Sequence, residues 1–226
     1  KIIYSDKYPS EEDDESRQNS FSSVLNMLDT MKQEKGKLLD IGCGYGSFMS
    51  MALKYKWAVE GMDISSYAAE HASQELGVPV FVGTLDQSDY PEDCFDVITL
   101  LDVIEHLNDP RVFLCEVRRI LKPEGVLVMR TPNQDSLFHW IAGLSARIGW
   151  DYPAQQIYHI DHLTYFTKSS LMYLLNQEGF NINKVEYETI DDKRFLGLKK
   201  VAISILRVVA AVLKKQSGMA AYCVLK

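Results

Sequence analysis

Asp40 precedes a run in which glycine occupies every second position, at Gly42, Gly44 and Gly46. Glycine-rich turns before a helix expose backbone N–H groups and let a ligand approach the main chain closely. A carboxylate beside such a turn would repel a pyrophosphate, but it would attract an ammonium or a sulfonium group. The spacing also differs from the G-x-G-x-x-G pattern of dinucleotide sites, because the third glycine comes one residue early. The run therefore favours a cationic ligand that contains a nucleoside.

A second carboxylate, Asp63, ends an apolar segment a little over twenty residues after Asp40. An acidic side chain at that point can accept hydrogen bonds from two vicinal ribose hydroxyls. Asp63 could instead cap the helix that we expect to begin near Ser65. Nicotinamide cofactors use the same ribose contact, so Asp63 indicates a nucleoside and leaves its chemistry open.

Three more titratable side chains, Asp102, Glu105 and His106, follow the apolar run 95–101. Such crowding is unusual for a structural turn, and it marks a candidate functional site. Histidine is the side chain whose ordinary pKa lies nearest to neutral pH, so His106 could act as a general base. The alternative is a histidine with a purely structural role.

The elements that must position these residues alternate between strands and helices. This alternation predicts a doubly wound α/β fold with a mostly parallel sheet, in which ligands bind beyond the carboxyl ends of the strands. The candidate residues stand at such ends. Strands are expected at 37–41, 57–64, 78–82, 95–101, 126–130, 180–190 and 220–225, and helices at 47–56, 110–121, 167–178 and 195–213, with a further helix capped by Ser65 or Ser66 and ended by Gly77.

The length of 226 residues suits a single domain, 1–226, that carries an insertion. We expect residues 1–35 to form an N-terminal helical or loop segment, with the acidic run 11–15 as a solvated loop. Residues 131–165 interrupt the alternation and are rich in aromatic side chains. This inserted segment could cover a substrate, or it could be a simple packing elaboration.

The composition excludes some classes of protein. A net charge of −7 argues against a surface built for nucleic-acid phosphates. The four cysteines are scattered without a C-x-x-C pair, which favours reduced thiols and a cytoplasmic location over a disulfide framework or a zinc site. No apolar run is long enough to predict a membrane-spanning helix.

The chain resembles class I S-adenosylmethionine-dependent methyltransferases, in particular the group that includes the ubiquinone-biosynthesis O-methyltransferases. The resemblance extends over residues 36–185 and implies a seven-stranded sheet, a Rossmann-like fold whose last strand runs antiparallel between strands five and six. It also implies S-adenosylmethionine as the cofactor. Five segments carry it, in this order and spacing: LLDIGCGYGSF, VEGMDIS, FDVITLLDVIEHLNDP, LKPEGVLVMRTPN and HLTYFTKSSLMYLLNQEGF.

By this resemblance, individual residues acquire expected roles at the cofactor. The ribose would lie at Asp63, and the adenine side at Thr84 and Leu85. His106 and Asp102 are the residues expected to take part in catalysis, close to the sulfonium. The full set of expected cofactor contacts is Asp40, Gly42, Cys43, Gly44, Gly46, Asp63, Ile64, Thr84, Leu85, Leu101, Asp102, Val103 and His106.

Relatives in quinone pathways carry an acidic residue, a glutamate and a histidine that resemble a divalent-metal cluster. Asp102, Glu105 and His106 echo that cluster in part, and His159 and His162 could contribute from the insertion. The first position is aspartate in this chain, so we assign no metal. The N-P-P-Y motif of methyltransferases that act on DNA bases or glutamine is absent, which disfavours those substrates.

The leading hypothesis is methyl transfer to a small-molecule acceptor, at a hydroxyl oxygen. Two alternatives stay open: a non-catalytic S-adenosylmethionine-binding module that assists a partner, and a nucleotide-linked oxidoreductase. The sequence leaves the identity of the acceptor and the oligomeric state undetermined.

The predicted helix 195–213 has more apolar residues than one buried stripe needs, and its charged residues are all basic. A membrane surface or a lipid-linked acceptor could dock there. The favoured expectation is that the helix covers one face of the sheet, with its lysines solvated.

Overall fold

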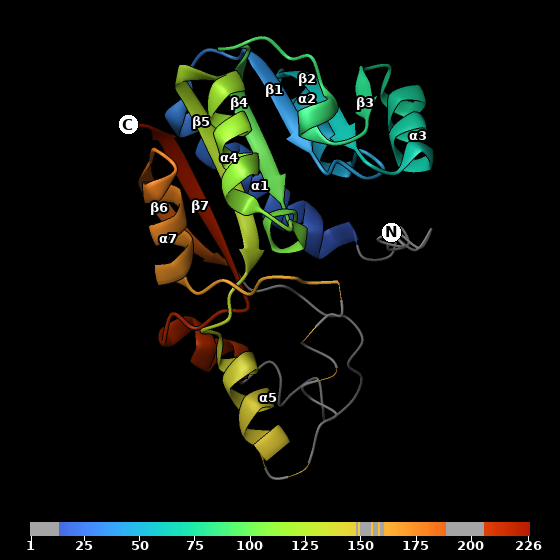
Figure 1. Cartoon of the computed structure of the whole chain (residues 1–226). Coiled ribbons are helices and arrows are strands. Elements are labelled where there is room, and N and C mark those ends of the chain that lie inside the picture. The colour runs from blue at the N-terminus through green and yellow to red at the C-terminus, as the bar shows by residue number, and fades with distance from the viewer. Residues whose placement is uncertain (1–13, 148, 150–154, 156–157, 159–160, 189–205) are drawn as a thin grey trace.

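A seven-stranded sheet with helices on both faces forms the body of the molecule (Figure 1). The computed structural model describes residues 14–147, 149, 155, 158, 161–188 and 206–226. The strands are β1 (Lys37–Ile41), β2 (Ala58–Asp63), β3 (Val80–Val82), β4 (Phe95–Leu101), β5 (Leu121–Pro132), β6 (Phe180–Glu188) and β7 (Gly218–Leu225). The helices are α1 (Asp14–Met31), α2 (Ser47–Lys54), α3 (Ser66–Leu76), α4 (Pro110–Ile120), α5 (Leu137–Arg147) and α7 (Lys168–Gln177), with short 3₁₀ turns η2 (Leu85–Gln87) and η3 (Ile104–His106).

The strand order is β3-β2-β1-β4-β5-β7-β6. The first five strands pair in parallel, while β7 is antiparallel to both β5 and β6. The predicted doubly wound sheet, with its last strand between the fifth and the sixth, is therefore confirmed. In the sheet, β2 lies on one side of β1 and β4 lies on the other. The strand order therefore reverses between β1 and β4, and their carboxyl ends form the switch point where such folds bind ligands.

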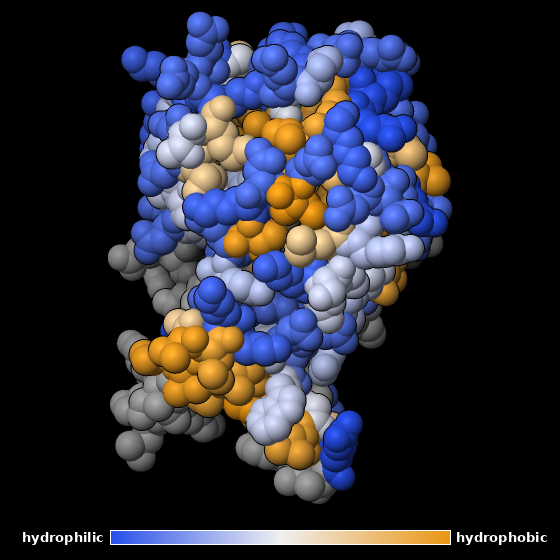
Figure 2. Space-filling view, turned by 90° about the vertical axis from the view of Figure 1, so that its left-hand side faces the viewer, coloured by the Kyte–Doolittle hydropathy of each residue, from blue (hydrophilic) through white to orange (hydrophobic). Residues whose placement is uncertain are grey.

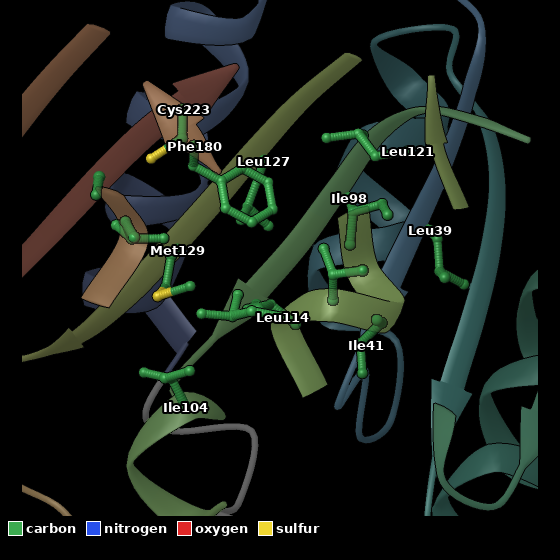
Figure 3. Packing of buried hydrophobic residues seen from close by; sticks show 14 of the residues in the cluster. Leu39, Ile41, Ile98, Ile104, Leu114, Leu121, Leu127, Met129, Phe180 and Cys223 are labelled. Atoms are coloured by element: carbon green, nitrogen blue, oxygen red, sulfur yellow. The ribbon is translucent and has the colours of Figure 1, made fainter. Parts of the chain in front are cut away.

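Side chains along the central strands alternate between two hydrophobic cores. Leu39 packs in the core covered by α4 and α7, whereas its neighbour Leu38 packs in the core covered by α1 and α2. Neighbouring strand residues point to opposite faces of a sheet, so near-continuous apolar strands supply both layers. Figure 3 shows part of the first core, with Leu114 of α4 among side chains of β1, β4 and β5.

The predicted boundaries of α3 and α4 follow from local chemistry. The Ser65 hydroxyl oxygen accepts a hydrogen bond from the Ala68 N–H at the start of α3, and Gly77 ends that helix with a φ of 65°. Asp109 caps α4 immediately before Pro110, which occupies the first helical position. Both helices therefore begin and end within a residue of the predicted positions.

Two local expectations were wrong. The acidic run 11–15 was expected to be a loop, but α1 begins at Asp14, and residues 11–13 lie outside the described part of the chain. The fifth strand was expected to begin at Val126, but β5 begins at Leu121, which pairs with Phe95. The pairing with β4 then passes from Leu121 to Val126, so residues 122–125 lie within a register shift.

The insertion places α5 beyond the carboxyl ends of β4 and β5, beside the segment that leads into β7 (Figure 1). Residues 195–205 of the predicted C-terminal helix lie outside the described residues, whereas 206–212 are helical. The expectation that this helix covers the sheet is wrong for 206–212, because Val208 and Val212 are exposed and only Ala210 is buried. No helix in the described ranges is long and apolar enough to cross a membrane.

Candidate functional site

The glycine run forms a tight loop between β1 and α2. Gly42, Gly44 and Gly46 adopt φ values of 76°, 53° and 82°, in the left-handed region that favours glycine. A Cβ on Gly42 would lie 2.5 Å from Cγ2 of Val103, so a larger residue would displace the loop after β4. No side chain caps the N-terminus of α2. The first N–H groups of this helix therefore face the end of the sheet without a side-chain acceptor, which suits a carboxylate ligand.

Asp63 ties this loop to the start of α3. Its buried carboxylate accepts hydrogen bonds from the Gly44 N–H at 2.8 Å and from the Ser65 N–H at 2.9 Å. Ser65 itself is the cap of α3. Asp63 is thus more than a helix cap, because it fixes the glycine loop at the carboxyl end of β2. Its contact with a ribose stays a prediction.

Asp40 lies buried at the end of β1. The Thr99 hydroxyl donates to its Oδ1 at 2.7 Å across the β1–β4 pair. Burial raises the pKa of Asp40 to about 7, and the nearby charge of Asp63 adds to the rise. The carboxyl group is therefore only partly ionised near neutral pH, and a cation placed beside it would favour the ionised form.

Asp102 is held by an ion pair that the sequence did not reveal. Its two carboxylate oxygens accept from Nε and Nη2 of Arg130, which is only 6% exposed. Arg130 Nη1 donates to the Ser20 hydroxyl at 2.8 Å, and Ser20 donates to Glu188 at 2.6 Å. This network links β4, β5, α1 and β6. It fixes Asp102, which has a φ of 62°, and commits its charge to Arg130, so the geometry favours a positioning role over proton transfer.

Glu105 is a buried carboxyl group in η3. Its Oε2 accepts from the Thr131 hydroxyl at 3.0 Å, while Oε1 has no hydrogen-bond partner among the described residues. Burial raises the pKa of Glu105 to about 8, with the charge of Asp102 as the next contribution. The backbone oxygen of Glu105 accepts from the N–H groups of Leu163 and Thr164. Glu105 therefore anchors the end of the insertion to the loop after β4.

His106 is oriented by the same segment. Its Nδ1 lies 2.9 Å from the carbonyl oxygen of Asp161. A carbonyl can only accept, so Nδ1 carries the proton of the neutral ring and Nε2 keeps a lone pair. This is the tautomer that a general base needs at Nε2. The role of His106 as a base stays a prediction.

A row of rings continues from His106 into the insertion. His106 and His162 lie 4.8 Å apart between ring centroids, and Tyr165 follows at 5.5 Å from His162. Tyr158 lies 5.2 Å from Tyr165, and His139 of α5 lies 5.3 Å from Tyr158. These rings come from three separate parts of the chain. Sequence reasoning named His106 and His162 as candidates, but it did not show that they belong to one row of rings.

Comparison with known proteins assigns the chain to a family. Residues 14–185, well over half of the chain, match the family model described as a methyltransferase domain. The chain belongs to the methyltransferase-domain family. This membership confirms the predicted enzyme class and the predicted cofactor, S-adenosylmethionine.

The curated relatives match only a part of their own length. The ubiquinone biosynthesis O-methyltransferase of Paramagnetospirillum magneticum is 36% identical over 121 residues, which cover 50% of this chain and 48% of the relative. The mitochondrial ubiquinone biosynthesis O-methyltransferase of Schizosaccharomyces pombe is 34% identical over 108 residues, or 45% of this chain and 39% of the relative. The matched region thus spans less than half of these relatives.

A solved structure shows the same fold. The crystal structure of a SAM-dependent methyltransferase from Archaeoglobus fulgidus superposes with a TM-score of 0.66 and covers 95% of this chain and 96% of its own. Its sequence identity is 19%, so the likeness concerns the fold. The predicted seven-stranded methyltransferase sheet is confirmed.

The other residues expected to contact the cofactor differ in how exposed their side chains are. Ile64 is 45% exposed next to Asp63, so its side chain can pack on a flat ring. Leu85 lies in the core, so only its backbone could border an adenine. Thr84 precedes it at the start of η2, and Cys43 is buried in the glycine loop. Leu101 and Val103 are half-buried at the end of β4 and just beyond it.

Three possible metal ligands lie close together, two in η3 and one in the insertion. Glu105, His106 and His162 offer ligand atoms that all lie within 4.8 Å of one another. His162 was an expected contributor from the insertion, whereas His159 lies outside the described residues. Asp102 is not a member of this cluster. A carboxylate with two imidazoles suits a borderline transition metal better than Mg²⁺.

Proposed function

We propose that this methyltransferase transfers a methyl group to a hydroxyl oxygen of a small-molecule acceptor, with His106 as the general base. S-adenosylmethionine supplies a methyl group that is already activated on a sulfonium. The chain then has to bind the acceptor, align its hydroxyl oxygen with the methyl group and exclude water. It also has to remove the hydroxyl proton. Nε2 of His106 accepts that proton as the oxygen takes the methyl group, and S-adenosylhomocysteine leaves.

The observation that carries the proposal is the hydrogen bond between Nδ1 of His106 and the Asp161 carbonyl oxygen. It fixes both the tautomer and the direction of the ring. The neighbouring rings of His162 and Tyr165 favour an acceptor with a flat, unsaturated ring, because such rings pack well edge to face. The names of the curated relatives, which are O-methyltransferases, support oxygen as the methylated atom.

The test is methyl transfer from labelled S-adenosylmethionine to a panel of phenols and matched anilines. We expect transfer to phenols and a fall of kcat by about 10²- to 10⁴-fold in His106→Gln, the usual range for loss of a general base. The Kd for S-adenosylhomocysteine should change much less than kcat, because glutamine keeps a polar side chain at the position expected to contact the cofactor. Full activity in the variant, or preference for anilines, contradicts the proposal. Cofactor binding with no transfer to any acceptor would instead indicate a binding module.

A further inference from the structure

Apolar side chains gather on the surface formed by α5 and the segment 206–213 (Figure 2). Exposed fractions of 78% for Val212 and 65% for Trp140 are large for such residues. The Leu137 N–H donates to the Lys215 carbonyl oxygen, so the start of α5 lies beside the end of that segment. We call the following residues the apolar patch: Trp140, Leu144, Val208, Val209, Val212 and Leu213.

The apolar side chains of these two helical segments point to solvent, whereas those of an ordinary surface helix point to the core. In 206–212, Ala210 is buried while three valines point to solvent. α5 buries His139, Ala142 and Ser145 and turns its opposite face outward. A helix on a protein surface normally directs its apolar stripe to the core. Gathered apolar side chains that face outward mark an interaction surface.

The charged residues of the two helical segments that carry the apolar patch are all basic. Residues 137–147 and 206–216 contain no aspartate or glutamate, although the whole chain has a net charge of −7. Arg147, Lys214 and Lys215 are exposed at the ends of the two helical segments. The basic residues of the two segments are Arg147, Arg207, Lys214 and Lys215.

We propose that the apolar patch and the basic residues around it form a surface that docks on an anionic membrane. A bilayer interface offers both complements at once, an apolar layer for the valines and Trp140 and anionic headgroups for the lysines. A second copy of the chain fits less well. A two-fold interface would bring the basic groups of one copy against the same groups of the other. The proposed attachment is interfacial, because the apolar side chains lie on the outer face of two short helical segments.

Co-sedimentation of the full chain with vesicles tests the docking surface. Vesicles of phosphatidylcholine alone are compared with vesicles that contain phosphatidylglycerol, at low and at high salt. We expect binding to the anionic vesicles at low salt, and a steep fall in binding as salt screens the lysines. Lys214→Gln with Lys215→Gln should weaken partitioning roughly 25-fold, since each basic residue near the surface contributes about fivefold.

Matched variants separate the apolar patch from general effects of charge. Val212→Asp, at a side chain that is 78% exposed, should strongly reduce binding. Val112→Asp, on α4 and 66% exposed, introduces the same charge elsewhere and should leave binding nearly unchanged. Lys54→Gln with Lys56→Gln is the corresponding control for the lysines, since both are exposed away from the apolar patch. Circular dichroism checks that each variant is folded.

Three results would overturn the proposal. The first is wild-type protein that ignores anionic vesicles at low salt. The second is an equal loss of binding in the Val112→Asp control, which would reduce the effect to net charge. The third is a wild-type dimer in sedimentation velocity that Val212→Asp converts to monomer, because the apolar patch would then belong to a second copy.

Discussion

Replacement of Asp40 by asparagine should remove a pH dependence from cofactor binding. Asp40 is buried and has a pKa raised to about 7, because burial disfavours its charged form. A ligand with an ammonium group beside the carboxyl group favours the ionised form, so binding expels the proton. Asparagine keeps an oxygen for the Thr99 hydroxyl but cannot ionise.

The size of the effect follows from the pKa. With a value of about 7, the ionised fraction of Asp40 rises from roughly 9% at pH 6 to roughly 76% at pH 7.5. If the complex contains only ionised Asp40, the Kd for S-adenosylhomocysteine should fall about eightfold over that interval. The Asp40→Asn variant should match the wild type near pH 6 and bind about eightfold more weakly near pH 7.5.

Isothermal titration calorimetry in buffers with different ionisation enthalpies measures both the Kd and the protons released. At pH 7 the wild type should release about half a proton per ligand bound, and the variant none. Glu105 also titrates near this range, with a pKa of about 8, so Glu105→Gln is the control and should keep the wild-type slope. A wild-type Kd that does not change with pH, or a slope that survives in Asp40→Asn, refutes this account of Asp40.

Three further predictions concern the loop and the buried charges. Gly42→Ala should abolish cofactor binding in calorimetry. The new Cβ would lie 2.5 Å from a valine side chain, and the residue has a φ of 76°, which alanine rarely adopts. Normal binding would show that the loop tolerates a side chain. Asp102→Asn should lower the free energy of unfolding in urea by about 2 to 3 kcal/mol, because it leaves the buried Arg130 charge unpaired, whereas Lys184→Gln in a surface pair should cost under about 1 kcal/mol. Equal losses would contradict this. Glu105 has a folded-state pKa of about 8, above its ordinary 4.5, so its contribution to stability is present at low pH and is lost as pH rises through about 8. In urea titrations from pH 5 to 9, the free energy of unfolding should therefore decline less steeply in Glu105→Gln than in the wild type.

Residues close together in the chain could be interpreted from the sequence. Asp40 and the three glycines form one loop, so the preference for a cationic nucleoside ligand was visible in a single segment. Ser65 and Gly77 marked the ends of α3 because caps act through hydrogen bonds to the nearest turn. The alternation of strands and helices then predicted a doubly wound, mostly parallel sheet, whereas the antiparallel last strand was implied only by the family resemblance.

Contacts between distant residues were decided only by the tertiary structure. The Arg130 hydrogen bond to Ser20 joins residues 110 positions apart, and the Ser20 bond to Glu188 joins residues 168 apart. No local pattern encodes such pairs, so the sequence left Asp102 as a candidate for catalysis without its buried partner. The same holds for Val208 and Val212. Their hydrophobicity was plain in the sequence, but whether they face the core or solvent depends on what packs against the helix, and that is set by the whole fold.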